Sequence, residues 1–355
     1  MTAPTVLRAP ARLEEDAGLR PMPWRRMAWV IWRQHRVALI GMTAVLGALA
    51  VWLWIAGLQL HHAYAAAIAC QPASSLYCSG LSNAFDGVNV LLAKGIPLQV
   101  VPPLIGAFLG APLLAREMES GTFRFAWTQG FGRWRWTLAK LVGLGVVVTA
   151  AAGALSILMS WYYQPYFSGG NPALFSANQV TIGASPLAPG LFDLRGVTFA
   201  AWTLAAFTIG VVAGLLIRRA VPAIVATLVA YTGLAVAAGG FLRQHYLTPL
   251  VANSLNVPGS AWIISEQWTK GGQPVSEFVV SQALRAAPGS VAGKGGIPNA
   301  LTTMQYLAQH GYTQLDTYQP ASRFWPFQWI EGGWLVTLSL LLFAVAVSLV
   351  RRRAV

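Results

Sequence analysis

The chain has 355 residues, of which 55% are hydrophobic and only 10% are charged. Soluble domains carry about 25% charged residues, so this composition excludes an ordinary soluble fold and indicates a protein of the lipid bilayer. The 24 Lys and Arg residues exceed the 11 Asp and Glu residues and give a net charge of +13. These basic residues flank long apolar runs and belong to no nucleic-acid-binding module, so we expect no nucleic acid as a partner.

Six windows of the sequence contain no Asp, Glu, Lys or Arg, and each approaches the roughly 20 residues that cross a bilayer as a helix. The windows are 37–60, 95–115, 141–163, 196–217, 220–242 and 332–350. The sequence therefore predicts an all-α membrane protein with six transmembrane helices, the first five within residues 37–241. Residues 242–331 are expected to form a large extracellular loop, with helical spacing over 275–287 and 300–310.

The distribution of basic residues predicts how the chain is oriented. If the N-terminus is cytoplasmic, 17 of the 24 Lys and Arg residues lie on the cytoplasmic side, in agreement with the positive-inside rule. We therefore expect a multi-pass protein of the inner (plasma) membrane with both termini cytoplasmic, including a flexible tail over 1–21 and a short tail over 351–355. Charges throughout the first 36 residues argue against a cleavable signal peptide.

Residues 22–36 separate basic from apolar side chains on a helical wheel. A sector of about 100° holds the basic side chains, which are Arg25, Arg26, Arg33 and Arg36. This pattern is typical of an amphipathic helix on the inner leaflet, with its arginines near anionic lipid or a cytoplasmic partner. The alternative is an N-terminal extension of the first membrane helix.

The two cysteines, Cys70 and Cys78, both fall in the first predicted extracellular loop. An oxidising exterior would permit a disulfide between them, closing a small hairpin. The alternative is two free thiols, and the short loop favours the disulfide because closing it costs little entropy.

The second window is rich in prolines, each of which removes a backbone donor from a helix and clashes one turn back. They are Pro97, Pro102, Pro103 and Pro112. We expect a kinked or broken helix, which is either a wall of a transport pathway or a purely structural kink. Residues 320–330 are expected to dip into the outer leaflet before the sixth helix. Candidates for a pathway or gate are therefore Pro102, Pro103, Gln328 and Glu331.

The sequence contains no recognisable catalytic constellation. It has no phosphate-binding G-x-x-x-x-G-K-[ST] loop, no metal-ligand spacing of His or Cys, and no nucleophile elbow. We expect no enzyme activity, no metal and no bound cofactor. The windows also lack the ionisable residues that ion-coupled carriers use, so energy for any transport should come from a cytoplasmic motor.

The loop over 116–140 is the candidate docking surface for such a motor. Thr122, after Gly121, can cap a short helix that ends near Gly130, and the following Arg and Trp residues can anchor the next membrane helix. The candidate coupling residues are Glu117, Glu119, Gly121, Thr122, Arg133 and Lys140. A solvated cytoplasmic loop would explain the arginines but not the glutamates or the tryptophans.

At this loop the chain resembles the permease subunits of type-two ABC exporters, especially those of actinobacteria. The resemblance rests on Glu117, Glu119, Gly121, Thr122, Trp127, Thr128, Gln129, Arg133, Trp136 and Lys140, and on the run YQPASRFWPFQWIEGG over 318–333. It implies a six-helix export fold similar to the G subfamily of ABC transporters, with an interfacial N-terminal helix, a coupling helix and a re-entrant segment. It also implies a separate ATPase subunit that binds ATP and Mg, and a permease that pairs with a second copy or with a different permease.

Two functions follow as hypotheses. The leading one is a permease subunit of an ATP-driven exporter, in which Glu117 and Glu119 start the coupling element, Gly121 and Thr122 shape its turn, and Arg133 and Lys140 fix the return to the third helix. The alternative is a non-transporting scaffold or sensor that acts with an ATPase through its extracellular loop. An intramembrane enzyme has no supporting constellation, and the sequence selects no substrate.

Overall fold

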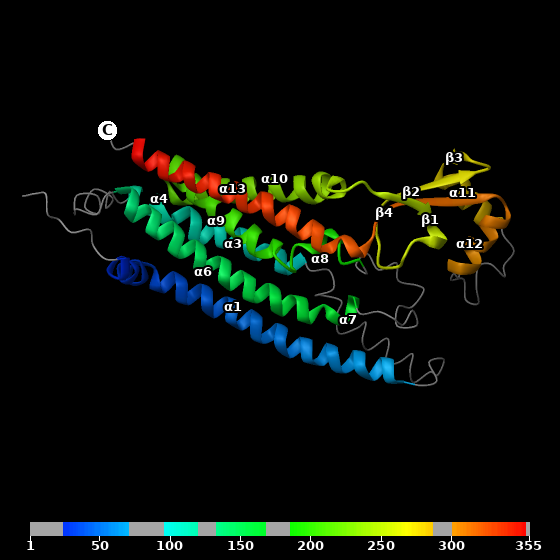
Figure 1. The fold of residues 1–355 in the computed structure, drawn as a ribbon, viewed down its shortest axis with the longest axis horizontal. Coiled ribbons are helices and arrows are strands. Elements are labelled where there is room, and N and C mark those ends of the chain that lie inside the picture. Colours follow the sequence, from blue (N-terminus) through cyan, green and yellow to red (C-terminus); the bar gives the residue numbers. More distant parts are fainter. Residues whose placement is uncertain (1–23, 71–95, 120–132, 168–184, 287–299, 353–355) are drawn as a thin grey trace, which may run out of the picture.

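The computed structural model describes residues 24–70, 96–119, 133–167, 185–286 and 300–352. Within this part of the chain, six helical runs are long and apolar enough to cross a membrane, which confirms the six predicted helices. The runs are Arg36–Ala69, Leu98–Glu119, Thr137–Tyr162, Thr198–Ile217, Ala220–His245 and Ala321–Arg352. They lie side by side in one elongated bundle (Figure 1).

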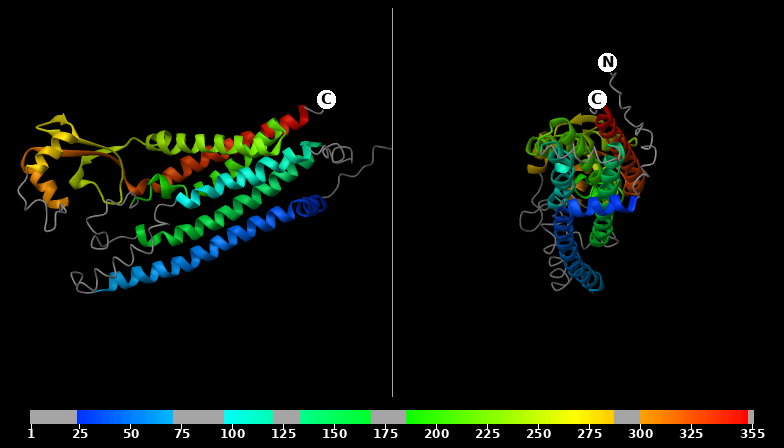
Figure 2. Two further views of the ribbon diagram at one scale, coloured as in Figure 1. Left: turned by 180° about the vertical axis from the view of Figure 1, so that it is seen from behind. Right: turned by 90° about the vertical axis from the view of Figure 1, so that its left-hand side faces the viewer.

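The first run is part of helix α1, Trp24–Ala69, which continues without interruption for 46 residues. No helix boundary separates residues 24–36, where an interfacial helix was expected, from the first membrane helix, since no Gly or Pro interrupts the chain between Trp24 and Ile40. The first turns nevertheless run across the direction of the rest (Figures 1 and 2). Their contact with a lipid surface stays a prediction.

The second run departs from a regular α-helix, as its prolines predicted. It passes through a 3₁₀ turn η2 (Ile96–Val100), a short helix α3 (Val101–Ile105), a π-helical turn η3 (Gly106–Gly110) and helix α4 (Ala111–Glu119). Prolines occupy the first positions of α3, where a missing backbone donor is tolerated. The irregular turns α3 and η3 pack against the fourth and fifth runs, as is expected where irregular backbone lies within a membrane bundle.

The remaining membrane helices begin or end close to the predicted windows. They are α6 (Arg133–Tyr162), α9 (Thr198–Ile217), α10 (Ala220–Ala237) and α13 (Phe324–Arg352). A π-helical turn η4 (Ala238–Leu242) and a 3₁₀ turn η5 (Arg243–His245) extend α10. Short helices α7 (Gln164–Phe167) and α8 (Pro189–Phe192) precede α9.

The segment expected to dip into the outer leaflet has a different structure. After a 3₁₀ turn η7 (Ala321–Arg323), the chain enters α13 directly, so residues 324–331 form the first turns of the sixth helix. The charge-free window started too late because Glu331 lies inside this helix, buried and paired.

Helix α9 is the centre of the bundle. It packs against α3, η3, α4, α6, α10 and α13, whereas α1 packs against α6 at the edge. Its close approach to η3 depends on small residues, since a Cβ at Gly210 would lie 2.8 Å from the backbone nitrogen of Ala111. A tight link joins α9 to α10, in which Arg218 takes a left-handed conformation and caps α9.

The loop expected over 242–331 contains a folded extension, so the chain is not purely α-helical. Four strands form an antiparallel sheet in the order β1-β4-β2-β3. They are β1 (Leu250–Asn253), β2 (Trp262–Lys270), β3 (Gln273–Val275) and β4 (Tyr312–Gln319). Helices α11 (Glu277–Arg285) and α12 (Ala300–Gln309) accompany them, close to the two helices predicted there.

The sheet lies at the end of the bundle opposite the described ends of the chain, which we call the sheet end and the termini end (Figure 1). Its outer hairpin turns at Gly271 and Gly272, both with positive φ, as a two-residue hairpin loop requires. Strands β1 and β4 are hydrogen-bonded neighbours, so the chain leaving α10 and the chain entering α13 run side by side. Gln319 Nε2 strengthens this junction by donating to the backbone oxygen of Leu247 at 2.7 Å.

Candidate functional site

Two of the predicted coupling residues meet at the termini end. The Nζ of Lys140, from α6, forms an ion pair with Oε1 of Glu117, from α4. Gln34 of α1 donates its Nε2 to the same oxygen at 2.9 Å. The Lys140 side chain has no exposed surface and that of Glu117 is 14% exposed, so solvent screens this pair weakly. The contact ties three helices together at one point.

A third coupling residue joins α4 to a fourth helix. Glu119, the last residue of α4, accepts a hydrogen bond from the backbone nitrogen of Ala220 at 3.4 Å. Ala220 begins α10, and a carboxylate at a helix N-terminus interacts favourably with the helix dipole. Gly121 and Thr122 lie outside the described residues, as does the coupling helix itself. Arg133 begins α6, and its side chain is not described.

The Glu117–Lys140 pair closes the segment between α4 and α6. Glu117 lies in the last turn of α4, and Lys140 lies in the second turn of α6. The ion pair therefore holds the two ends of the 116–140 region in a fixed relation. Separating the two charges would leave each without a partner in a largely buried place, which is energetically costly. The junction is therefore expected to be rigid.

A larger ionic cluster lies at the sheet end. Arg243 donates Nε to Oε2 of Glu331 at 2.9 Å and Nη2 to Oε1 of Glu331 at 2.7 Å, a bidentate arrangement. The same Nη2 donates to Oδ1 of Asp193. Trp202 Nε1 and the Tyr246 hydroxyl donate to the two Glu331 oxygens at 2.9 and 3.2 Å. Each Glu331 oxygen thus accepts two hydrogen bonds.

Local structure brings these charges together from three parts of the chain. The π-helical turn η4 immediately precedes Arg243, and its extra residue rotates the following side chains about the helix axis. Asp193 caps the C-terminus of α8, just before α9. Glu331 lies on the early turns of α13. Both Arg243 and Glu331 are fully buried, although each lies directly beside one of the charge-free windows.

The cluster carries two carboxylates against one guanidinium. Burial raises the pKa of Asp193 to about 7, and the neighbouring Glu331 carboxylate acts in the same direction. The Arg243 guanidinium opposes this shift by stabilising the charged carboxylate. Asp193 is therefore the group of this cluster whose charge changes near neutral pH.

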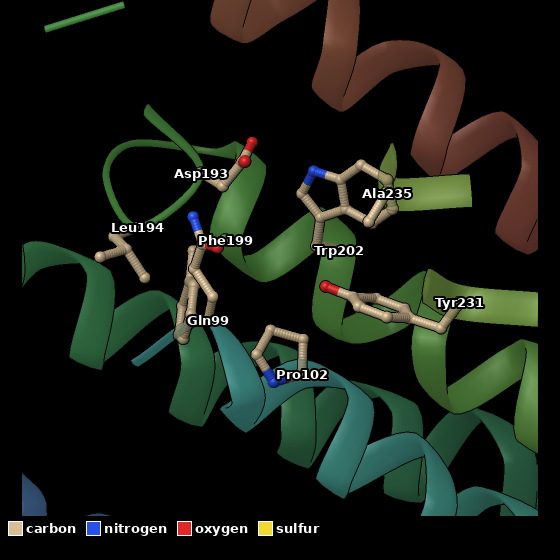
Figure 3. A pocket seen from close by; sticks show the side chains of 8 residues that line it. All are labelled: Gln99, Pro102, Asp193, Leu194, Phe199, Trp202, Tyr231 and Ala235. Atoms are coloured by element: carbon tan, nitrogen blue, oxygen red, sulfur yellow. The ribbon is translucent and has the colours of Figure 1, made fainter. Parts of the chain in front are cut away.

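A cavity of about 70 Å³ lies beside the cluster and connects it to the irregular second run (Figure 3). Asp193 contributes to its wall, as do Phe199 and Trp202 of α9, Tyr231 of α10 and Pro102 of α3. Figure 3 shows the Tyr231 hydroxyl directed between Trp202 and Pro102. The cavity is thus bounded by three membrane helices and the segment that precedes α9.

The four predicted pathway or gate residues have different positions. Pro102 lines the cavity, whereas Pro103 and Glu331 are not among the described lining residues. Glu331 lies behind the wall, where it accepts a hydrogen bond from the lining residue Trp202. Gln328 accepts hydrogen bonds through Oε1 from the backbone nitrogens of residues 197 and 198 at 2.9 and 3.0 Å. Gln328 therefore caps the N-terminus of α9, and its role in a pathway or gate stays a prediction.

Sequence reasoning missed Arg243, Asp193 and Trp202. A signal was present, because Arg243 directly follows the fifth window, Glu331 directly precedes the sixth, and Asp193 stands just before the fourth. Arg243, Glu331 and Asp193 therefore flank windows at the same predicted side of the membrane, where opposite charges can meet. The partners could be assigned only once the helices that lie side by side were known.

The first cysteine follows the end of α1, and Cys70 is disulfide-bonded. Cys78 lies outside the described residues, so the pairing of Cys70 with Cys78 stays a prediction. Among the described residues, no group of three or more His, Cys, Asp or Glu side chains is placed to hold a metal ion.

The six apolar helices of the bundle define a multi-pass membrane protein. A family model described as ABC-2 membrane transporter related matches residues 43–243, more than half of the chain. The chain belongs to this family, whose members are membrane components of transport systems. Membership of this family implies an ABC ATPase as a partner. Neither a search of curated proteins nor a search of solved structures gives a match.

Proposed function

We propose that the chain is the permease subunit of an ATP-driven ABC exporter. It forms the substrate pathway as a dimer, and residues 116–140 couple it to a separate ATPase subunit that binds ATP and Mg. The observation that carries this proposal is the buried Glu117–Lys140 ion pair at the two ends of the 116–140 region.

The packing of the bundle supports a coupling role for this junction. Helices α4 and α6 both pack against the central helix α9. A displacement applied between α4 and α6 is therefore transmitted to α9 and, through α9, to α10 and α13. Because interiors are close-packed, such a displacement moves helices as units rather than compressing them.

The placement of basic residues supports a cytoplasmic termini end. Arginines from four separate segments lie at the ends of helices on this side of the bundle. They are Arg33, Arg36, Arg116, Arg218, Arg219, Arg351 and Arg352. Under the positive-inside rule this end faces the cytoplasm, where an ATPase would bind.

Reversal of one exposed charge tests the coupling proposal. Glu119 is exposed at the last position of α4, so Glu119→Lys loses one hydrogen bond from Ala220 but should keep the fold while repelling a basic contact on an ATPase. We expect the ATPase that co-purifies with the tagged chain from host membranes to fall about tenfold, corresponding to roughly 1.4 kcal/mol. Quantitative mass spectrometry and ATP hydrolysis by the purified complex measure this change.

The matched control reverses an exposed carboxylate at the other end of the molecule. Glu277→Lys changes the same charge at the start of α11 and should leave ATPase recovery unchanged. Thermal unfolding of both variants verifies that they are folded. Equal ATPase recovery with the two variants would exclude coupling through the end of α4.

The scaffold or sensor alternative is supported by the folded sheet extension. Because Asn253 and Leu315 are paired neighbours on β1 and β4, residues 254–309 can be replaced by a short linker without separating α10 from α13. For a transporter we expect unchanged recovery and basal activity of the ATPase in this deletion. A folded deletion variant that loses basal ATPase activity would favour the sensor.

A further inference from the structure

The walls of the cavity beside the Asp193–Arg243–Glu331 cluster favour a positively charged ligand. Among its described lining residues there is no Lys, Arg or His, while Asp193 contributes a carboxylate. Gln99 donates Nε2 to the backbone oxygens of Pro189 and Gly190, both at 3.1 Å, which uses both amide hydrogens. Only its acceptor, Oε1, is left for a ligand. An anion would find no charged partner here.

The two carboxylates of the cluster are not equivalent. The Glu331 side chain has no exposed surface, and both of its oxygens accept hydrogen bonds from Arg243 and aromatic partners. The Asp193 side chain retains 24% exposure, and it lines the cavity. The net negative charge of the cluster is therefore accessible from the cavity through Asp193.

The remaining walls are largely aromatic. Phe199, Trp202 and Tyr231 come from two helices, and the rings of Trp202 and Tyr231 meet edge to face at 5.4 Å. Aromatic faces attract cations through their quadrupoles, and this attraction grows when water is excluded. The volume of about 70 Å³ exceeds several-fold the roughly 10–15 Å³ that one water requires. A compact headgroup fits, whereas a bulky ring system does not.

We propose that this cavity binds the quaternary ammonium headgroup of an organic cation. The Asp193 carboxylate supplies the counter-charge, and the rings of Phe199, Trp202 and Tyr231 contact the methyl groups. The headgroup can come from a small soluble cation or from a lipid, since both present the same chemistry. The proposal is independent of coupling to an ATPase, because binding is measured on this chain alone.

The test compares choline with its uncharged isostere, 3,3-dimethyl-1-butanol. The full-length protein is placed in nanodiscs of phosphatidylglycerol, which contain no quaternary ammonium, and titrated by calorimetry with Trp fluorescence as a second readout. We expect saturable binding of choline and at least about tenfold weaker binding of the isostere. Equal binding of the two compounds, or no choline binding, would overturn the proposal.

Two variants locate the binding within the cavity. Asp193→Asn keeps the shape and leaves Arg243 paired with Glu331, and it should weaken choline binding about tenfold. Trp202→Phe retains a ring of reduced size and should weaken it less. Glu266→Gln, which removes an exposed carboxylate of β2, is the matched control and should bind as the unmodified protein does. Choline affinity that is unchanged in both cavity variants contradicts the assignment.

The pH dependence of binding gives an additional readout. Asp193 faces Arg243 and Tyr231 from the α10 side and Glu331 from α13. The pKa of Asp193 is raised to about 7, so its charge is gained over this range. Because neutralising Asp193 should weaken binding about tenfold, choline affinity should rise roughly fivefold from pH 6 to pH 8, while affinity for the isostere stays constant. A flat choline profile together with unchanged choline binding by Asp193→Asn would exclude Asp193 as the counter-charge.

A second lipid composition distinguishes the two sources of the headgroup. In nanodiscs that contain phosphatidylcholine, loss of choline binding shows that a lipid headgroup reaches the cavity. Unchanged choline binding in these nanodiscs shows that the cavity is closed to lipid and accepts a soluble cation. Either result agrees with a quaternary ammonium site and only identifies the source of the headgroup. The comparison with the isostere and the cavity variants are the tests that can reject the site.

Discussion

Replacing Arg243 with Met is expected to remove most of the folded protein from detergent extracts. The substitution keeps the length of the side chain but leaves the buried Glu331 carboxylate, and the Asp193 carboxylate beside it, without their positive partner. Breaking a buried ion pair in this way costs about 3–5 kcal/mol, a large fraction of the stability of a typical domain. Fluorescence-detected size exclusion and the midpoint of thermal unfolding measure the loss.

The loss should be reversed by neutralising the carboxylates as well. A triple variant with Arg243→Met, Glu331→Gln and Asp193→Asn buries no net charge, and we expect it to recover most of the folded yield. Arg285→Met, at the exposed end of α11, is the matched control and should behave as the unmodified protein does. An Arg243→Met protein with an unchanged midpoint would show that the cluster does not stabilise the bundle.

The second large effect is expected at Gly210, where α9 and η3 come into backbone contact. A methyl group at this position would clash with the backbone oxygen of Gly106 and lie 2.8 Å from the backbone nitrogen of Ala111. Both atoms belong to backbone, which cannot move aside as a side chain can. Overpacking of this kind costs about 1–3 kcal/mol or more, so Gly210→Ala should lower the unfolding midpoint clearly.

A glycine with free space around it provides the comparison. Gly233 lies in α10, and nothing stands within 4 Å of the position that its Cβ would occupy. Because alanine favours helices by up to about 1 kcal/mol over glycine, Gly233→Ala should raise the midpoint slightly or leave it unchanged. If both substitutions have the same effect, the contact between α9 and η3 does not limit stability.

The six membrane runs could be predicted because hydropathy alone decides which segments cross a bilayer. Their limits were less certain, since the windows excluded every charged residue. Lys140 and Glu331 lie within helices, and each is paired with an opposite charge from another membrane run. A window that considers one segment at a time cannot include that pairing. The windows for α6 and α13 therefore began too late.

The site was predictable in part. Glu117 and Lys140 were chosen from a single loop, and the structure brings them into contact. Pro102 and Glu331 were placed in a pathway or gate, and both lie at or next to the cavity. Arg243 was missed because its role depends on which helices are neighbours. The sheet was missed although Gly271 and Gly272, between two β-forming runs, are typical of a hairpin.

The junction between the sheet and the bundle has a mechanical consequence. Helices α10 and α13 are fastened twice at this end, once by the pairing of β1 with β4 and once by the contact of Arg243 with Glu331. The two helices cannot separate at the sheet end unless the strand pairing and the Arg243–Glu331 contact both break. Any hinge motion within this half of the molecule must therefore move α10, α13 and the sheet together as one rigid body. The peripheral helix α1, which packs on α6, is free of that constraint.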